Sequence, residues 1–177
     1  MASFAGELRL LLHTTERPQV PANPAWPCAT GTTTAFRQMI ILDTNVLSEV
    51  MKPSPSARVL EWLAKESALS VFTTAIAMAE ILYGIELLPK GRRRAALASA
   101  AEAMFEEDFA GRILPFDSDA ARVFPKIAAA RRASGRPITQ FDAQIAAIAR
   151  CRGAAIATRN AGDFEDCGVT VLNPWNE

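Results

Sequence analysis

Histidine is nearly missing from this sequence: the chain of 177 residues has one, His13. Its three cysteines, Cys28, Cys151 and Cys167, include no closely spaced pair. Structural zinc sites and redox motifs need such residues at short, regular spacings, so the sequence provides a framework for neither. A reducing location, the cytoplasm, is therefore expected.

The chain also lacks net charge and long apolar runs. It carries 19 basic and 19 acidic side chains, so no overall field attracts nucleic acid, and any such binding must come from a local arrangement. No apolar run approaches the roughly 20 residues that span a bilayer, so no membrane segment is expected. Hydrophobic residues make up 50% of the chain, which predicts one globular domain with a substantial core.

Residues 1–38 differ in composition from the rest of the chain. Prolines recur every three residues, at Pro18, Pro21, Pro24 and Pro27, and the polar stretch that follows has no periodicity. We expect a poorly ordered extension, or a segment translated from an upstream start, that adds nothing to the core or to a site. The folded domain is then residues 39–177.

Strand and helix patterns alternate within that domain. Short apolar runs predict strands at 39–42, 69–73, 113–116, 154–157 and 169–172. Between them, helices are predicted at 45–51, 56–64, 75–88, 91–109, 117–134 and 139–152. This alternation predicts an α/β fold of three layers, in which helices cover both faces of a central parallel sheet of about five strands.

Four acidic residues are predicted to meet at one edge of this sheet. Asp43 directly follows the unbroken apolar run of the first strand, at the carboxyl end where parallel sheets bind ligands. Glu80 and Asp142 lie on predicted helix faces with apolar residues, and Asp163 lies in the loop after the fourth strand. The face assigned to Glu80 also carries Tyr83 and Leu87, and should turn away from solvent.

Each acid taken alone has an ordinary structural explanation. Asp43 can cap the helix that follows it, and Glu80 can extend along a helix edge into water. Thr139 and Asp142 have the spacing of a capping box, and Asp163 can stabilise a turn. The combination is less ordinary, because unpaired carboxylates that share one edge repel one another. A hard divalent cation, Mg²⁺ or Mn²⁺, relieves that repulsion and suits phosphodiester hydrolysis by activated water.

These residues resemble the motifs of the PIN-domain family. The matching segments are Asp43-Thr44-Asn45 after the first strand, Ala79-Glu80 with Gly84, Asp142 with Ile145-Ala146-Ala147 and Ala149, and Ala157-Thr158-Arg159-Asn160 before Asp163-Phe164. The segment 111–117 and the ending Asn173-Pro174-Trp175 look like the VapC-type toxin branch, particularly its FitB-like members. The resemblance covers Met39 to the C-terminus.

The resemblance implies a function and a set of site residues. It implies a homodimeric, Mg²⁺- or Mn²⁺-dependent endoribonuclease, the toxin of a type II toxin–antitoxin module, restrained by a VapB/FitA-like antitoxin. The residues that match family acids are Asp43, Glu80 and Asp142, with Asp163 or the position of Asn160 as the fourth. Thr44, Asn45 and Thr158, with Asn160, match positions that orient ligands or water. The alternative is a PIN-like module that binds nucleic acid or protein without cleaving it.

Arginines near the predicted site are candidate RNA contacts. Arg131, Arg132 and Arg136 precede the helix that carries Asp142 and could hold phosphates, whereas the run 92–94 is more typical of a solvated helix face. The helices between 75 and 109 carry more apolar surface than one sheet face can cover. We therefore expect the homodimer interface there, at Leu82, Leu88 or Leu97.

Overall fold

A central parallel sheet of five strands organises the molecule. The computed structural model describes residues 39–177, so the expectation for residues 1–38 lies outside the described part of the chain. The strand order is β3-β2-β1-β4-β5, and every pairing is parallel. The strands are β1 (Ile40–Leu42), β2 (Val71–Thr74), β3 (Ile113–Leu114), β4 (Ala155–Ala157) and β5 (Val171–Leu172).

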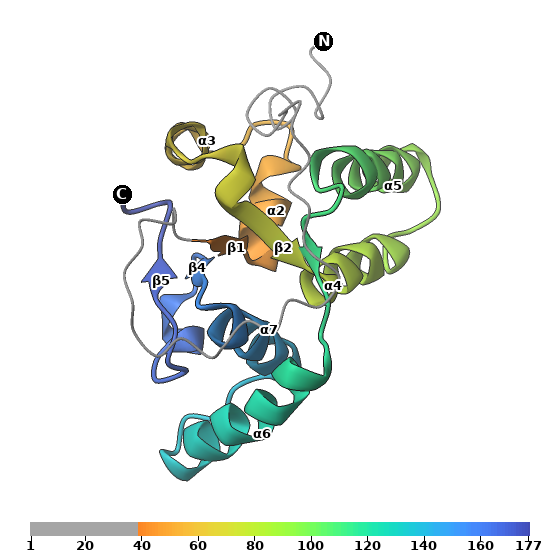
Figure 1. Cartoon of the computed structure of the whole chain (residues 1–177). Coiled ribbons are helices and arrows are strands. Elements are labelled where there is room, and N and C mark those ends of the chain that lie inside the picture. The colour runs from red at the N-terminus through yellow and green to blue at the C-terminus, as the bar shows by residue number, and fades with distance from the viewer. Residues whose placement is uncertain (1–38) are drawn as a thin grey trace.

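Six α-helices connect and cover the strands. They are α2 (Thr44–Val50), α3 (Ala57–Lys65), α4 (Ala75–Glu86), α5 (Arg92–Ala103), α6 (Ser118–Ala133) and α7 (Gln140–Arg152). In the view of Figure 1, α2 and α3 lie above the strands, α6 and α7 lie below them, and α4 and α5 form a pair at the right. The predicted α/β architecture, with helices around a parallel sheet, is confirmed.

The first strand is the centre of the sheet, which explains its unbroken apolar sequence. It pairs with β2 on one side and with β4 on the other, so that Ile41 lies beside both Phe72 and Ile156. Ile41 and Ile156 are fully buried. The chain leaves β1 towards β2 and later returns to its other side, so the carboxyl end of β1 is the topological switch point where such sheets bind ligands.

Side-chain and glycine caps mark several helix ends. The Asp117 carboxylate accepts hydrogen bonds from two backbone amides of α6, and Thr139 Oγ1 accepts one from the amide of Asp142. Gly153 ends α7 with a left-handed φ of 61°, a conformation that favours glycine. Ser56, in contrast, makes no side-chain capping bond to α3.

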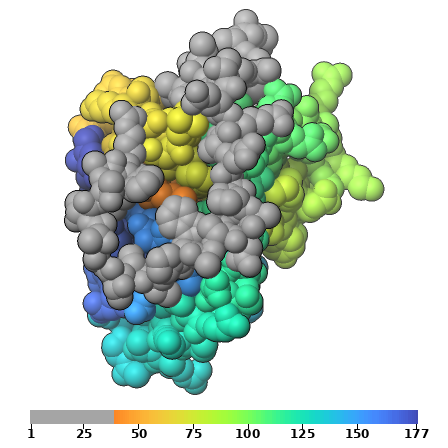
Figure 2. All heavy atoms as spheres, viewed as in Figure 1, coloured from red at the N-terminus to blue at the C-terminus, as the bar shows by residue number. Residues whose placement is uncertain are grey.

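Two predicted elements differ in extent. The helix predicted at 91–109 divides into α5 and a π-helical turn, η2 (Met104–Asp108), after which the chain bends towards β3. Residues Ala68–Ser70 form a 3-10 turn, η1, so β2 begins at Val71. In Figure 2 the surface around residue 90, between α4 and α5, projects from the right edge of the molecule. No helix within residues 39–177 is both long and apolar enough to cross a membrane.

Candidate active site

The four predicted acids line one pocket at the carboxyl edge of the sheet. Asp43 follows β1, Glu80 lies on α4, Asp142 on the first turn of α7, and Asp163 in the short 3-10 helix η3 (Ala161–Phe164) after β4. The pocket has a volume of about 410 Å³. It is lined by Asp43, Thr44, Asn45, Ser48, Glu49, Lys52, Glu80, Asp142, Arg159, Asn160, Asp163 and Trp175.

Asp43 is the buried member of the acidic group. Only 5% of its surface is exposed, and its Oδ2 accepts hydrogen bonds from Asn45 Nδ2 at 2.7 Å and from Thr158 Oγ1 at 2.8 Å. It occupies the N-cap position of α2 but makes no side-chain capping bond. The explanation of Asp43 as a simple helix cap is therefore wrong, because its carboxylate is directed to residues at the site.

Asn45 and Thr158 join the ends of two neighbouring strands. Asn45 Nδ2 also donates to Thr158 Oγ1 at 2.9 Å, and Asn45 Oδ1 accepts from the amide of Arg159 at 2.9 Å. The amide of Asn160 donates to Thr158 Oγ1 at 3.1 Å. This network orients the Asp43 carboxylate from both β1 and β4.

Glu80 lies at the border of the buried face of α4. Its Oε2 accepts a hydrogen bond from Thr44 Oγ1 at 2.7 Å. The face predicted for it was wrong in part, since Tyr83 and Leu87 are 62% and 67% exposed. The buried face carries Ala77, Ile81 and Ile85 instead. The buried face of α4 therefore includes Ile81, the residue after Glu80, and not Glu80 itself. The Glu80 carboxylate is half-buried and faces the pocket.

Asp142 serves the helix end and the pocket together. Thr139 Oγ1 accepts a hydrogen bond from the Asp142 amide at 3.1 Å and donates one to its Oδ2 at 2.6 Å. Thr139 therefore caps α7 with its side chain, as one half of a capping box does, whereas the Asp142 carboxylate bonds to the Thr139 hydroxyl and not to its backbone amide. The half-buried Asp142 carboxylate also lines the pocket. The apolar face predicted behind it, formed by Ile145, Ala146 and Ala149, is fully buried.

Burial and mutual repulsion disfavour the charged forms of these acids. Burial raises the pKa of Asp43 to about 6, against the lowering effects of its hydrogen bonds with Thr158 and with the Thr44 amide, and the charges of Asp142 and Glu80 raise it further. Burial is also the main cause that raises the pKa of Glu80 and of Asp142, and the nearby Asp163 adds to the rise for Asp142. The pocket therefore concentrates negative charge that a cation would stabilise.

Comparison with known proteins identifies the family. A family model described as "PIN domain" matches residues 40–168. The chain belongs to the PIN-domain family. It is 39% identical over 137 residues to VapC ribonuclease Y4jK of Sinorhizobium fredii, a match that covers 77% of this chain and 98% of that protein. It is 39% identical over 139 residues to toxin FitB of Neisseria gonorrhoeae, covering 78% of this chain and 100% of FitB.

Solved structures of similar proteins have the same fold as this PIN domain. The crystal structure of FitAcB from Neisseria gonorrhoeae matches with a TM-score of 0.70 and 38% identity, over 78% of this chain and 100% of that chain. The structure of FitAB bound to an IR36 DNA fragment matches with a TM-score of 0.72 and 39% identity, over 77% of this chain and 96% of that chain.

The arginines predicted to contact RNA do not line the pocket of this PIN domain. Arg131 is 5% exposed and its guanidinium donates to two backbone carbonyls, so this structure directs it away from the pocket, and its contact with RNA stays a prediction. Arg136 is exposed but pairs with Glu165 and Asp166, and Arg132 is exposed outside the pocket lining. The last turn of α6 packs on the segment after η3 rather than on the pocket.

Two other basic residues line the pocket. Lys52 pairs with Glu49 at 2.6 Å. The guanidinium of Arg159 lies 5.5 Å from the ring centre of Trp175, and within residues 39–177 no carboxylate forms an ion pair with it. Sequence reasoning missed Arg159, although it directly follows Thr158 at the end of β4. Trp175 is half-buried, packs against the hydrophobic core and also lines the pocket.

A larger apolar groove adjoins the acidic pocket. It has a volume of about 1210 Å³ between α2, α4 and α5. It shares Thr44, Ser48, Lys52 and Glu80 with the pocket, and Leu88 and Leu97 also line it. A chain bound in this groove would therefore reach the acidic site.

The raised pKa of Asp43 predicts a pH-dependent difference in stability. Because the folded state holds the Asp43 proton more tightly than the unfolded chain, the contribution of Asp43 to the stability of wild type should fall as pH rises from about 4 to about 6 without metal. A shift of about two units corresponds to roughly 2 to 3 kcal/mol. Asp43→Asn has no carboxylate at this position to titrate. The free energy of unfolding of the variant, relative to that of wild type, should therefore increase as pH rises from about 4 to about 6.

Denaturant unfolding in EDTA at several pH values measures this difference. Glu102→Gln, which removes a carboxylate at an exposed position on α5, is the matched control. An Asp43→Asn difference that is constant between pH 4 and pH 7 would mean that the carboxylate titrates alike in the folded and unfolded chains.

Proposed function

We propose that this protein is a metal-dependent endoribonuclease, the toxin of a type II toxin–antitoxin pair. The observation that carries the proposal is the convergence of Asp43, Glu80, Asp142 and Asp163 on one pocket, with the buried Asp43 held by Asn45 and Thr158. The similar proteins named VapC ribonuclease and toxin FitB support the same activity. The substrate is RNA, and the reaction is hydrolysis of a phosphodiester bond.

The donor atoms of the pocket suit Mg²⁺ or Mn²⁺. Among residues 39–177, carboxylate, amide and hydroxyl oxygens line it, without histidine or cysteine, and hard cations prefer such ligands. Within residues 39–177, no three acidic, histidine or cysteine side chains are already grouped tightly enough to hold a metal ion. Mg²⁺ usually keeps several waters and needs one or two protein carboxylates, so a pocket of dispersed carboxylates supports it without a closed cage.

Each residue of the pocket has a defined part in this proposal. The four carboxylates would surround the cation, with one or two bound to it directly and the others through its waters. Thr44 orients Glu80, and Asn45 and Thr158 orient Asp43. A bound divalent cation would lower the pKa of water and neutralise charge on the phosphate. Arg159, whose guanidinium lies over the ring of Trp175, forms no ion pair with a carboxylate in residues 39–177, although its charge helps to lower the pKa of Glu49, and it binds a phosphate of the RNA.

Replacing Asp43 by asparagine tests both metal and catalysis. Asp43→Asn should abolish RNA cleavage, because a neutral amide is a poor ligand for a hard cation. Without metal it should be more stable than wild type at pH 7, because repulsion is relieved. Mn²⁺ at a hundredfold excess over its Kd should stabilise wild type by about 2.7 kcal/mol and the variant far less.

Thermal unfolding in EDTA and in Mn²⁺, with cleavage of a model RNA, measures these effects. If wild type gains no stability from Mn²⁺, the pocket is not a metal site. If wild type binds RNA but does not cut it in Mg²⁺ or Mn²⁺, the protein is instead a non-catalytic PIN-fold binding module.

Arg159 should affect substrate binding through charge. Arg159→Met should raise the KM for RNA and reduce by about one the slope of log(kcat/KM) against log salt concentration, because one phosphate contact is lost. Arg132→Met, an exposed arginine outside the pocket lining, is the comparison and should leave the slope unchanged. An equal fall in both variants would show that RNA also follows α6.

The groove between α2, α4 and α5 receives a segment of the antitoxin. The structures that match this chain include one titled as a member of the VapBC family of toxin–antitoxin systems, from Mycobacterium tuberculosis, at 25% identity and a TM-score of 0.60. Because the groove shares Glu80 and Thr44 with the pocket, a chain lying in it inhibits the site directly. The proposal also includes a homodimer. Of the leucines expected at its interface, Leu82 is 38% exposed on α4, whereas Leu88 and Leu97 line the groove.

Gly84 allows the groove to be filled without disturbing the protein's own core. A Cβ added there meets no neighbouring atom of residues 39–177 within 4 Å. Gly84→Ala should stabilise the free protein by about 0.5 to 1 kcal/mol, because alanine favours a helix. Gly84→Phe should weaken antitoxin binding at least tenfold by occupying the groove.

Calorimetric titration with the antitoxin, and light scattering of the free proteins, measure these outcomes. Gly84→Ala is the control and should bind the antitoxin nearly as wild type does, and all three proteins should have twice the 19.1 kDa mass of one chain. Unchanged affinity in Gly84→Phe would place the antitoxin elsewhere, and a monomeric wild type would contradict the dimer.

A further inference from the structure

Asp163 is held differently from the other three acids of the pocket. Asp43, Glu80 and Asp142 each accept a side-chain hydrogen bond from a threonine. The Asp163 carboxylate accepts none from any residue in 39–177, and its side chain is exposed. Its place in the pocket therefore depends on the backbone that carries it.

That backbone is short and irregular. The 3-10 helix η3 has four residues, and Asp166 follows with a positive φ of 58°. A single 3-10 turn has few internal hydrogen bonds, so its carbonyl groups need partners from elsewhere. In this segment the amide of Asp163 donates to the carbonyl of Asn160 at 3.0 Å.

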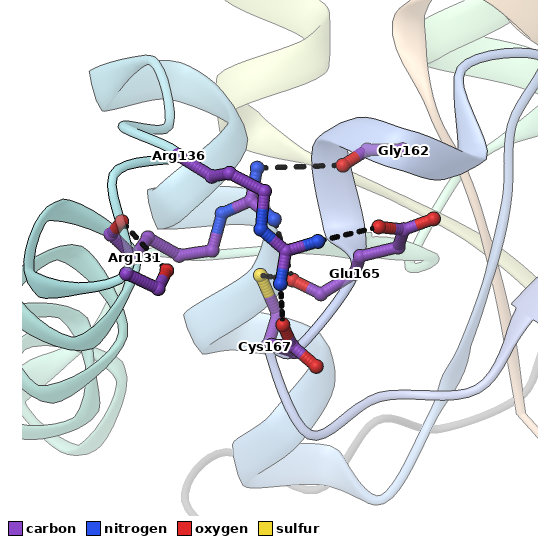
Figure 3. A network of polar contacts seen from close by, with 7 residues as sticks. Arg131, Arg136, Gly162, Glu165 and Cys167 are labelled. Carbon is purple, nitrogen blue, oxygen red and sulfur yellow. Dashed lines mark hydrogen bonds and ion pairs between the residues drawn. The ribbon is translucent and has the colours of Figure 1, made fainter.

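Arg131 provides the external partners. From α6, its Nη1 donates to the carbonyl of Glu165 at 2.8 Å and its Nη2 donates to the carbonyl of Gly162 at 3.3 Å. Figure 3 shows Arg131 and Arg136 directed towards the segment that runs from Gly162 to Cys167. One guanidinium therefore spans Asp163, since it holds the carbonyl just before that residue and the carbonyl two residues after it.

The burial of Arg131 makes this contact different from a surface ion pair. Its side chain is 5% exposed, its Nε has no hydrogen-bond partner within residues 39–177, and no carboxylate there pairs with it. Burying a charge without an acid is unfavourable unless its hydrogen bonds compensate. Arg136, by contrast, is exposed, and its pairs with Glu165 and Asp166 should contribute little.

We propose that Arg131 is a positioning residue that holds the backbone around Asp163 so that its carboxylate faces the acidic pocket. The effect of Arg131 on catalysis rests on the proposed ribonuclease function. Its effect on the backbone around Asp163 does not. Arg131 has no contact with the pocket. Its effect on the reaction passes through Asp163, and it should change kcat while leaving the KM for RNA and the salt dependence unchanged.

Hydrogen exchange of the full-length protein tests the structural part. In Arg131→Met, amides of residues 161–167 should exchange at least tenfold faster than in wild type, while those of β1 and β4 stay protected. Arg132→Met, an exposed neighbour on the same helix turn, is the control and should match wild type. Equal exchange of residues 161–167 in both variants would overturn the proposal, even if the protein cleaves RNA.

A double-mutant cycle tests the route through Asp163. Arg131→Met should lower kcat at least tenfold in wild type and less than twofold in the Asp163→Asn background, because the carboxylate it positions is already gone. Losses that multiply would show a general structural role and overturn the proposal. A raised KM with a smaller salt slope would return Arg131 to the role of a substrate contact.

Two further outcomes keep the test decisive. If Arg131→Met fails to fold, Arg131→Lys replaces it, since its ammonium can reach one of the two carbonyls and should give exchange and kcat between wild type and the loss expected for methionine. Full wild-type behaviour of Arg131→Lys in both measurements would show that the paired donors are not needed. If wild type cuts no RNA, the ribonuclease proposal fails. The hydrogen exchange of residues 161–167 still tests whether Arg131 holds the backbone around Asp163.

Discussion

The carboxylate of Asp43 lies where only 5% of the residue reaches water, at the end of the central strand, with two other acids close enough to raise its pKa. Its hydrogen bonds with Asn45 and Thr158 partly offset this cost. Thr158 can donate only because β4 pairs directly with β1, with Leu42 opposite Ala157. The strand order therefore determines whether this acid can be accommodated at all.

The other acids come to the same place by separate routes. Glu80 lies on α4, which follows β2, and Asp142 lies on α7, which precedes β4. Asp163 lies in the four-residue helix η3, which follows β4. Helices and side-chain hydrogen bonds from Thr44 and Thr139 hold the first two. The turn has no such rigidity of its own, so its position depends on a buried guanidinium from another helix.

The acidic pocket and the apolar groove share one wall. Thr44, Ser48, Lys52 and Glu80 line both, and the groove continues between α4 and α5, beyond the sheet. A ligand in the groove and a substrate in the pocket would compete for the same residues. Steric exclusion is sufficient to couple partner binding to activity in such an arrangement, without a conformational change.

The basic residues show how far linear spacing can mislead. Arg131, Arg132 and Arg136 are close in sequence to Asp142, yet one is buried under the turn that carries Asp163, and another pairs with exposed acids. Arg159, which lines the pocket, gave no signal in charge or periodicity. The direction of a long side chain depends on what packs beside its helix or loop, and that is a property of the assembled chain.

Local patterns in the sequence were sufficient for the order of the strands and helices and for the edge of the sheet where the acids lie, although not for every element boundary. An unbroken apolar run predicts a strand buried on both faces, Thr139 and Asp117 predict helix starts, and acids after strands predict a shared edge, because each signal depends on neighbours a few residues away. Tertiary structure alone decided the rest: which residue of α4 faces the core, which arginine is buried, and where the groove meets the pocket. These depend on contacts between segments far apart in the chain, whose geometry no short stretch of sequence encodes.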